Sequence, residues 1–100
     1  MGSRLELHDE LLKFYQNVYF QPPSNQQMKY PCIVYHKNGK DRKFGNDKLY
    51  FVKQGYRLTV IETHPDGTIA DEIESAFEYC TIAQNFVSDS LHHTTLNLFY

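Results

Sequence analysis

The residues of this 100-residue chain that could carry out chemistry are five histidines, two cysteines and several carboxylates. Asp66, Asp71 and Glu72 lie close together in sequence, and carboxylates so placed could hold a divalent metal ion, as in a small nuclease. Their positions already have a structural cause, because they fall in a turn and in the first turn of an expected helix, where the helix dipole favours acids. We therefore expect no metal site.

The histidines and cysteines form no pattern typical of a metal centre or a catalytic pair. His92 and His93 are adjacent, so on a strand they would point to opposite faces and could not bind one ion together. Cys32 and Cys80 are far apart in sequence, and no local signature marks either as reactive. A glycine-rich phosphate loop and a nucleophile elbow are also missing, so we expect neither an enzyme nor a cofactor.

The charged side chains separate into two blocks along the chain. All ten Lys and Arg residues lie between Arg4 and Arg57, where they accompany five acidic residues, whereas residues 58–100 carry seven acidic residues and no basic one. A chain of this length forms a single domain, so both blocks belong to one body. Separate positive and negative patches would favour head-to-tail contact between copies, whereas blocks that interleave on folding would cancel.

The basic stretch 37–48 is the densest charged segment. It is consistent with a solvated hairpin tip, with docking onto an acidic protein surface, or with contact to nucleic acid. A formal net charge of −2 argues against general nucleic-acid binding. The candidate inter-subunit or partner contacts are Lys40, Arg42, Lys43, Phe44, Asp47 and Lys48 in this stretch, with Asp71, Glu72, Glu74 and Glu78 in the acidic block.

Composition limits the class of protein further. The eight Tyr and seven Phe residues are typical either of strand edges or of surfaces that meet other proteins. No run of 18 or more apolar residues and no charged-then-apolar leader is present, so we expect neither a membrane span nor a secreted protein. The two cysteines are expected to be small buried residues of a protein made in a reducing cytosol.

Apolar periodicity predicts a helix at the start of the chain. Ser3 is a suitable N-cap, and Glu6 three residues later completes a capping box. The helix is expected to continue to about Asn17 and to bury one apolar stripe. The residues assigned to that stripe are Leu5, Leu12 and Tyr15, with Leu11 and His8 close by.

Five strands are predicted, at about 18–20, 30–36, 49–63, 81–87 and 93–100. Asn38 and Gly39 favour a tight turn, and the polar segment 38–48 is expected to be a long loop or hairpin tip. Gly55 marks a bulge or a break within the third predicted strand. The last strand should tie the C-terminal residue into the sheet.

The segment 64–68 predicts a turn that leads into a second helix, which ends near Tyr79. Thr68 is a suitable N-cap, and the expected core stripe consists of Ile69, Ile73, Ala76 and Phe77. The resulting order is α-β-β-β-α-β-β. It predicts a single-domain α+β fold over residues 1–100, with a mostly antiparallel sheet and two helices packed on it.

Several segments, taken in this order, resemble a known family. They are VYFQPP (18–23), YPCIVY (30–35), Phe44 with NDK (46–48), Tyr56 with TVI (59–61), PD (65–66), IADEI (69–73), DSLHH (89–93) and LNLFY (96–100). This set is similar to the small tail-completion or tail-terminator proteins of long-tailed bacteriophages, also described as head–tail joining or minor tail proteins.

The resemblance implies a structural virion protein rather than an enzyme. Such subunits form a ring, usually hexameric, that terminates the tail tube and joins it to the head connector. The implied partners are further copies of the chain, the major tail tube protein and head-completion or connector proteins, with transient passage of DNA through the ring lumen and no membrane. The implied location is the head–tail junction of the virion, after synthesis in the bacterial host cytoplasm.

Two other interpretations stay open at this point. The chain could be a tail-assembly adaptor or tube-related subunit of similar fold, or a small nucleic-acid-binding regulator. A ring former should sediment as a closed oligomer, whereas a regulator should be a monomer or dimer that binds DNA in a strongly salt-dependent way.

Overall fold

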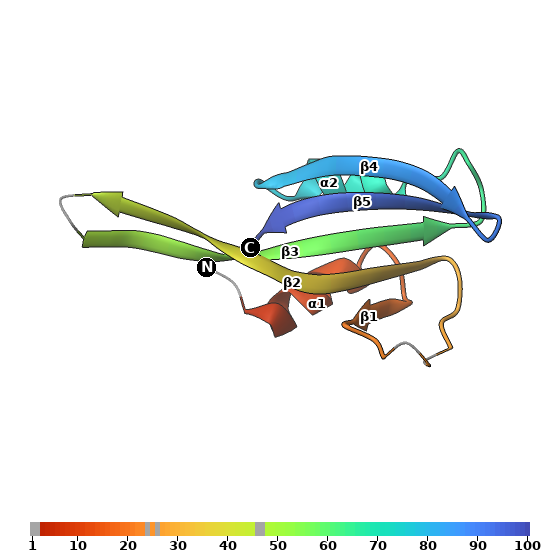
Figure 1. Ribbon diagram of the computed structural model, residues 1–100, viewed down its shortest axis with the longest axis horizontal. Coiled ribbons are helices and arrows are strands. Elements are labelled where there is room, and N and C mark those ends of the chain that lie inside the picture. Colours follow the sequence, from red (N-terminus) through yellow and green to blue (C-terminus); the bar gives the residue numbers. More distant parts are fainter. Residues whose placement is uncertain (1–2, 24, 26, 46–47) are drawn as a thin grey trace.

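A five-stranded sheet with two helices on one face forms the body of the protein (Figure 1). The computed structural model describes the backbone of residues 3–23, 25, 27–45 and 48–100, and the side chains of these residues except within 40–53. The elements are α1 (Arg4–Leu12), β1 (Val18–Phe20), β2 (Cys32–Gly45), β3 (Lys48–Glu62), α2 (Ile69–Ala76), β4 (Cys80–Ser88) and β5 (Leu91–Phe99). This order confirms the predicted α+β fold.

The strands are arranged in the order β1-β2-β3-β5-β4. The short β1 pairs in parallel with β2, and every other neighbouring pair in the sheet is antiparallel. The β4–β5 hairpin is joined by Asp89 and Ser90, whose φ angles of 52° and 63° give a turn that matches the twist of an antiparallel pair. The sheet therefore has two edges, β1 and β4.

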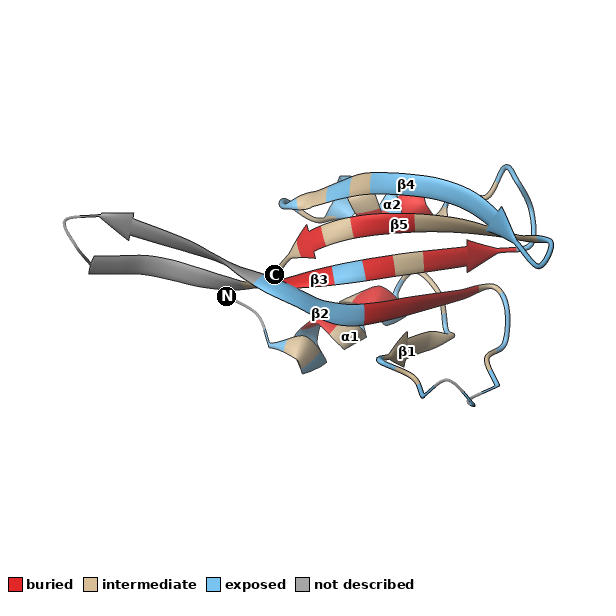
Figure 2. Cartoon of the chain, in the orientation of Figure 1, coloured by how far each residue is buried: buried red, intermediate tan, exposed pale blue. Residues whose placement is uncertain are grey.

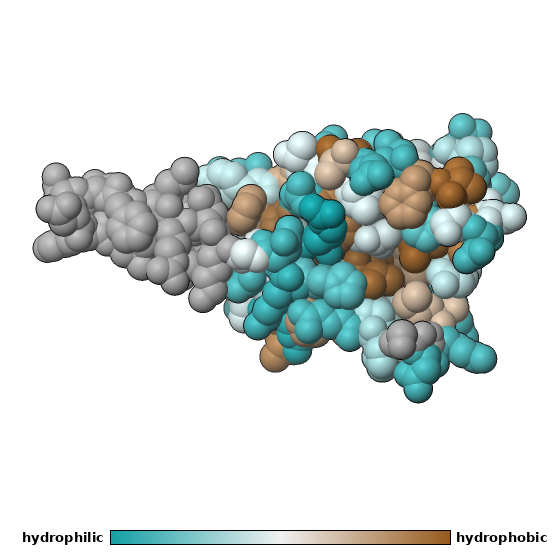
Figure 3. Space-filling model, in the orientation of Figure 1, coloured by the Kyte–Doolittle hydropathy of each residue, from teal (hydrophilic) through white to brown (hydrophobic). Residues whose placement is uncertain are grey.

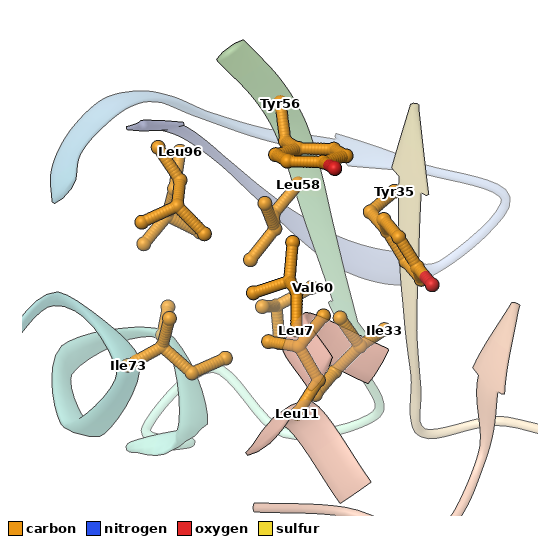
Figure 4. Close-up of a cluster of buried hydrophobic side chains, with 11 residues drawn as sticks. Leu7, Leu11, Ile33, Tyr35, Tyr56, Leu58, Val60, Ile73 and Leu96 are labelled. Atoms are coloured by element: carbon orange, nitrogen blue, oxygen red, sulfur yellow. The ribbon is translucent and has the colours of Figure 1, made fainter. Parts of the chain in front are cut away.

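The main core lies between the sheet and the two helices. Alternate residues of the central strands point to the helical face, as the period-2 pattern predicts. Figure 4 shows Leu7 and Leu11 of α1 and Ile73 of α2 directed toward these strands. The strand residues of this core are Ile33, Tyr35, Tyr56, Leu58, Val60, Leu96 and Leu98. Figure 2 shows burial concentrated in the central strands, whereas β4 is exposed along most of its length.

A second, smaller cluster covers part of the opposite face. Cys32, Val34 and Ile61 are buried there, and Tyr19, Met28 and Leu91 pack against them. The burial of Cys32 confirms the expectation for that residue, whereas Cys80 is only half-buried.

The first helix differs from its prediction in length and in the face that it buries. The Ser3 Oγ accepts the Glu6 N–H at 3.2 Å, which confirms the predicted N-cap. The helix ends at Leu12 rather than near Asn17. Its buried residues are Leu7 and Leu11, whereas Leu5 and Leu12 are 65% and 41% exposed.

Contacts with a residue distant in sequence determine which face of α1 is buried. Arg4 and His8, which lie beside Leu7 and Leu11 on the helix, both reach the hydroxyl of Tyr35. That hydroxyl belongs to a fully buried side chain, so its polar partners fix which side of α1 meets the sheet.

The β2–β3 hairpin is longer than the strand beside it. The pairing of β3 with β5 ends at Gly55 and Phe99, so no third strand of the described chain pairs with the remainder of the hairpin. We call this two-stranded segment, residues 38–53, the arm. It extends from one end of the body and accounts for a long axis of 51 Å against 26 and 22 Å (Figure 1). Of the two expectations for 38–48, the hairpin agrees with the structure and the long loop does not, because β2 continues to Gly45 and β3 begins at Lys48.

Asn38 and Gly39 form a bulge instead of the predicted turn. The register of β2 shifts between Lys37 and Lys40, and Gly39 has a φ of 73°. Gly55 lies opposite this bulge on β3, which continues through it without a break. A Cβ atom at Gly55 would overlap the Asn38 carbonyl oxygen, so the close approach of the two backbones requires glycine there.

The second helix begins as predicted but is shorter. Thr68 is its N-cap residue, although its side chain makes no capping hydrogen bond, and Asp71 and Glu72 lie in the first turn. The helix ends at Ala76, which is exposed rather than part of the core. At the C-terminus the Tyr100 N–H donates to the Gln54 carbonyl oxygen at 3.0 Å, so the last residue is tied to β3 as expected.

Candidate assembly surfaces

The basic candidate residues lie on the arm. Lys40, Arg42, Lys43 and Phe44 belong to β2 and Lys48 begins β3, with side chains outside those that the structure describes, and Asp47 lies outside the described residues altogether. Residues 38–53 contain five Lys or Arg residues and two Asp residues. A two-stranded hairpin with no third strand or helix is only marginally stable in water, so contact with another surface would stabilise the arm.

The acidic candidate residues lie together on and beside α2. Asp71 and Glu72 are exposed in its first turn, and Glu78 is exposed just after its end. Glu74 is half-buried, and its Oε2 accepts the Ile82 N–H of β4 at 2.8 Å. Glu74 therefore has a structural role within the subunit, because it satisfies a backbone donor of an edge strand.

The acidic surface has no cationic partner within the described part of the chain. The single ion pair found there joins Lys13 and Glu10 on α1, with 3.0 Å between Nζ and Oε1. No Lys or Arg follows Arg57 in the sequence. In the described part of the chain, no Lys or Arg therefore forms an ion pair with the acids of α2 or of its neighbouring turns.

The edge strand β4 lies next to this acidic surface. Phe86 and Val87, near its end, are 41% and 63% exposed. Figure 3 shows hydrophobic residues gathered on the drawn face toward the end of the body where β4 turns into β5. An edge strand with exposed apolar residues is a favourable surface for another chain.

Glu62 is a functional candidate that the sequence interpretation missed. It is the last residue of β3, and its side chain is only 9% exposed. A Cβ atom at Gly67 would overlap its carboxyl group, so the turn before α2 packs directly over it. The signal was present in the period-2 pattern, because Glu62 continues the inward-facing series of Tyr56, Leu58 and Val60.

The surroundings of Glu62 disfavour its charged form. Burial raises the pKa of its carboxyl group, and the nearby charges of Asp71 and Glu72 raise it further. The Ile69 N–H at the start of α2 and the nearby His92 act in the opposite direction and lower the pKa. Glu62 thus combines burial, acidic neighbours and a helix N-terminus at one point.

The histidines and cysteines have varied surroundings. His8 has a structural role, with its Nδ1 2.6 Å from the Tyr35 hydroxyl, and His93 stacks on Phe86 with 4.7 Å between ring centroids. Burial raises the pKa of both Cys32 and Cys80 to about 11, which disfavours their reactive thiolate forms. Among the described residues, no three His, Cys, Asp or Glu side chains are grouped to hold a metal ion.

Comparison with known proteins gives no family for this chain. No protein-family model matches it, and no curated protein matches it either. Within the described residues, no helix is long and apolar enough to cross a membrane.

Proposed function

We propose that the protein is a structural subunit of a homo-oligomeric ring at the head–tail junction of a long-tailed bacteriophage. In this role it terminates the tail tube and joins it to the head connector, in a ring that is hexameric as in the family it resembles. The observation that carries the proposal is the separation of the basic arm from the acidic surface on α2, at different places on one small body.

This separation favours one kind of self-association. An isologous contact through α2 would bring acidic side chains against acidic side chains, and a contact between two arms would bring cations together. A head-to-tail contact joins the arm of one copy to the acidic surface of the next, and it closes into a ring when the rotation between copies permits. The exposed β4 edge gives the same contact additional area.

The remaining parts of the proposal follow from that ring. Its two rims would meet the major tail tube protein and the head-completion or connector proteins, and DNA would pass transiently through the lumen. The subunit would be made in the bacterial host cytoplasm and would end in the virion. The chain would need no cofactor and would catalyse no reaction. A tail-assembly adaptor or tube-related subunit would use the same surfaces, and the tail-binding experiment below separates it from a terminator.

The test is assembly of the purified protein. We expect a closed oligomer by native mass spectrometry and analytical ultracentrifugation, and a ring bound at one end of purified tail tubes by electron microscopy. An adaptor or tube subunit would instead bind elsewhere or lengthen the tube. Because the contact is electrostatic, ring formation should weaken as salt rises toward 1 M, where the Debye length is about 3 Å.

A triple variant, Lys40→Glu, Arg42→Glu and Lys43→Glu, should lose ring formation while keeping the thermal melt of the parent. Lys29→Glu reverses an exposed cation outside the arm and serves as the control. A parent protein that stays monomeric at all concentrations and ignores tail tubes would overturn the proposal. Tight, salt-sensitive DNA binding by that monomer would favour the regulator instead.

A further inference from the structure

A hollow lies beside Glu62, between the start of α2 and the end of the β4–β5 hairpin. Its volume is about 440 Å³, within the usual range of small-ligand sites. One part of its lining is acidic, with Glu62 and Asp71, and another part is apolar or aromatic, with Ile82, Phe86 and Val87. A long side chain with an apolar stem and a cationic head suits such a lining.

The buried carboxyl group of Glu62 is the feature that points to a cation. A buried carboxylate ordinarily has a cationic partner, and the described part of this chain supplies no Lys or Arg to it. His64, His92 and His93 also line the hollow, and none of the described residues that line it is Lys or Arg. Within the described part of the subunit, Glu62 therefore has the Ile69 N–H and the nearby His92 beside it, but no Lys or Arg.

We propose that this hollow receives Arg42 from the arm of a second copy of the chain. Arg42 is the only arginine of the arm, and a guanidinium group can pair with a carboxylate through two parallel hydrogen bonds. It can also stack on an aromatic ring, which the Phe86–His93 pair offers. The inference rests on the proposed ring and names the contact that builds it.

The path of β3 explains why the arm must come from another copy. β3 starts in the arm at Lys48 and ends beside the hollow at Glu62. From Lys53 to Glu62 the strand spans roughly 30 Å at about 3.3 Å per residue, so it holds the two sites apart. Figure 1 shows the arm at one end of the molecule and the β4–β5 turn at the other. A site and its complement at opposite ends of one strand make a head-to-tail contact.

Two complementary variants test this contact. The pocket variant carries Glu62→Gln and Asp71→Asn and keeps the arm. The arm variant carries Lys40→Gln, Arg42→Gln and Lys43→Gln and keeps the hollow. Each alone should fail to form rings, with association weakened about 30-fold or more, as for loss of a buried charge partner. An equimolar mixture should form one heterodimer and nothing larger, because only one productive contact remains.

Native mass spectrometry resolves the two variants by mass and reads this result directly. The matched control is Glu6→Gln with Asp9→Asn on α1, which removes the same charge from exposed positions that do not line the hollow and should still form rings. Circular dichroism melts confirm that every variant is folded. If Glu62→Gln disturbs folding, Asp71→Asn alone, at an exposed position, carries the pocket test.

The outcomes separate this inference from the proposed function. A pocket variant that forms rings like the parent overturns the Arg42 contact and leaves the ring intact. If the parent forms open filaments and the pocket variant does not assemble, the Arg42 contact is supported but the ring is not. Binding of free arginine amide by the parent, with assembly unaffected by the pocket variant, would identify a small-molecule site and overturn the inference.

Discussion

Helices α1 and α2 pack against the same face of the sheet, but their polar side chains have different surroundings. On α1, Arg4 lies 3.3 Å from the Tyr35 hydroxyl and 4.4 Å from the Phe20 ring centroid, and Lys13 pairs with Glu10. On α2, the exposed acids have no cation beside them in the described part of the chain. Arg4, Glu10 and Lys13 of α1 thus find side-chain partners inside the subunit. On α2, Glu74 accepts a backbone N–H, but the exposed acids form no ion pair in the described part of the chain.

The difference indicates where a second body is needed. A helix whose charged groups are paired internally contributes to folding and needs no partner chain. A helix with one sign of charge and a buried carboxylate beneath it has lower energy when a cation arrives. We therefore expect α1 substitutions to act mainly on stability and α2 surface substitutions to act mainly on assembly.

The largest stability effects should come from the apolar faces, where the two helices are alike. Leu11→Ala and Ile73→Ala each remove a fully buried side chain and should cost about 2–5 kcal/mol of unfolding free energy. Urea denaturation followed by circular dichroism measures this. Leu5→Ala, at a position 65% exposed, should change stability by less than about 0.5 kcal/mol. If Ile73→Ala costs less than about 0.5 kcal/mol, α2 is held in place by contacts with another copy rather than by the core.

Tyr35→Phe tests the internal pairing of α1. The substitution removes the hydroxyl that contacts His8 and Arg4 but keeps the ring, and the polar groups left without it should cost about 1–3 kcal/mol. The same denaturation experiment applies. Tyr30→Phe, on a tyrosine that is 42% exposed, is the matched control and should leave stability unchanged. Equal effects of the two substitutions would contradict an anchoring role for the Tyr35 hydroxyl.

The sequence was informative where a local rule decides the structure. Ser3 as N-cap, the turn before α2 and the alternation of Tyr56, Leu58 and Val60 all depend on neighbours in the chain. The buried face of α1 could not be read in this way, because four leucines allow two stripes. The choice between them is made by Tyr35, which is distant in sequence.

The candidate site likewise depends partly on local sequence and partly on tertiary structure. The acids of α2 and the cations of the arm are visible in the sequence as blocks of charge. Their placement at opposite ends of β3 depends on where β5 stops pairing, which local patterns do not specify. Asn38 and Gly39 illustrate the limit of prediction from local sequence. A turn and a bulge both place a glycine at positive φ, and only the pairing between β2 and β3 distinguishes them.

Glu62→Gln tests the buried carboxyl group through the pH dependence of stability. Because burial raises the folded-state pKa, the unfolded chain releases this proton first as pH rises, and the folded state loses relative stability. The parent should therefore lose stability relative to Glu62→Gln as pH rises from about 4.5 through the raised folded pKa. Below about pH 4.5 the two proteins should converge. Parallel pH profiles, measured by thermal melts of unassembled protein, would mean that Glu62 does not titrate differently on folding.

The smallest stability effects should come from the exposed acids in the first turns of α1 and α2. These acids allow the two helices to be compared directly. Glu6 and Asp71 both lie in the first turn of a helix and are both exposed, so Glu6→Gln and Asp71→Asn should each cost about 0.3–1 kcal/mol through the helix dipole. Only Asp71 lines the hollow. Asp71→Asn should therefore weaken assembly about fivefold, as for loss of one partly exposed ion pair, whereas Glu6→Gln should leave it unchanged. Sedimentation equilibrium of both variants measures the association. If the two substitutions weaken association equally, net charge rather than the position of the charge on α2 controls association between copies.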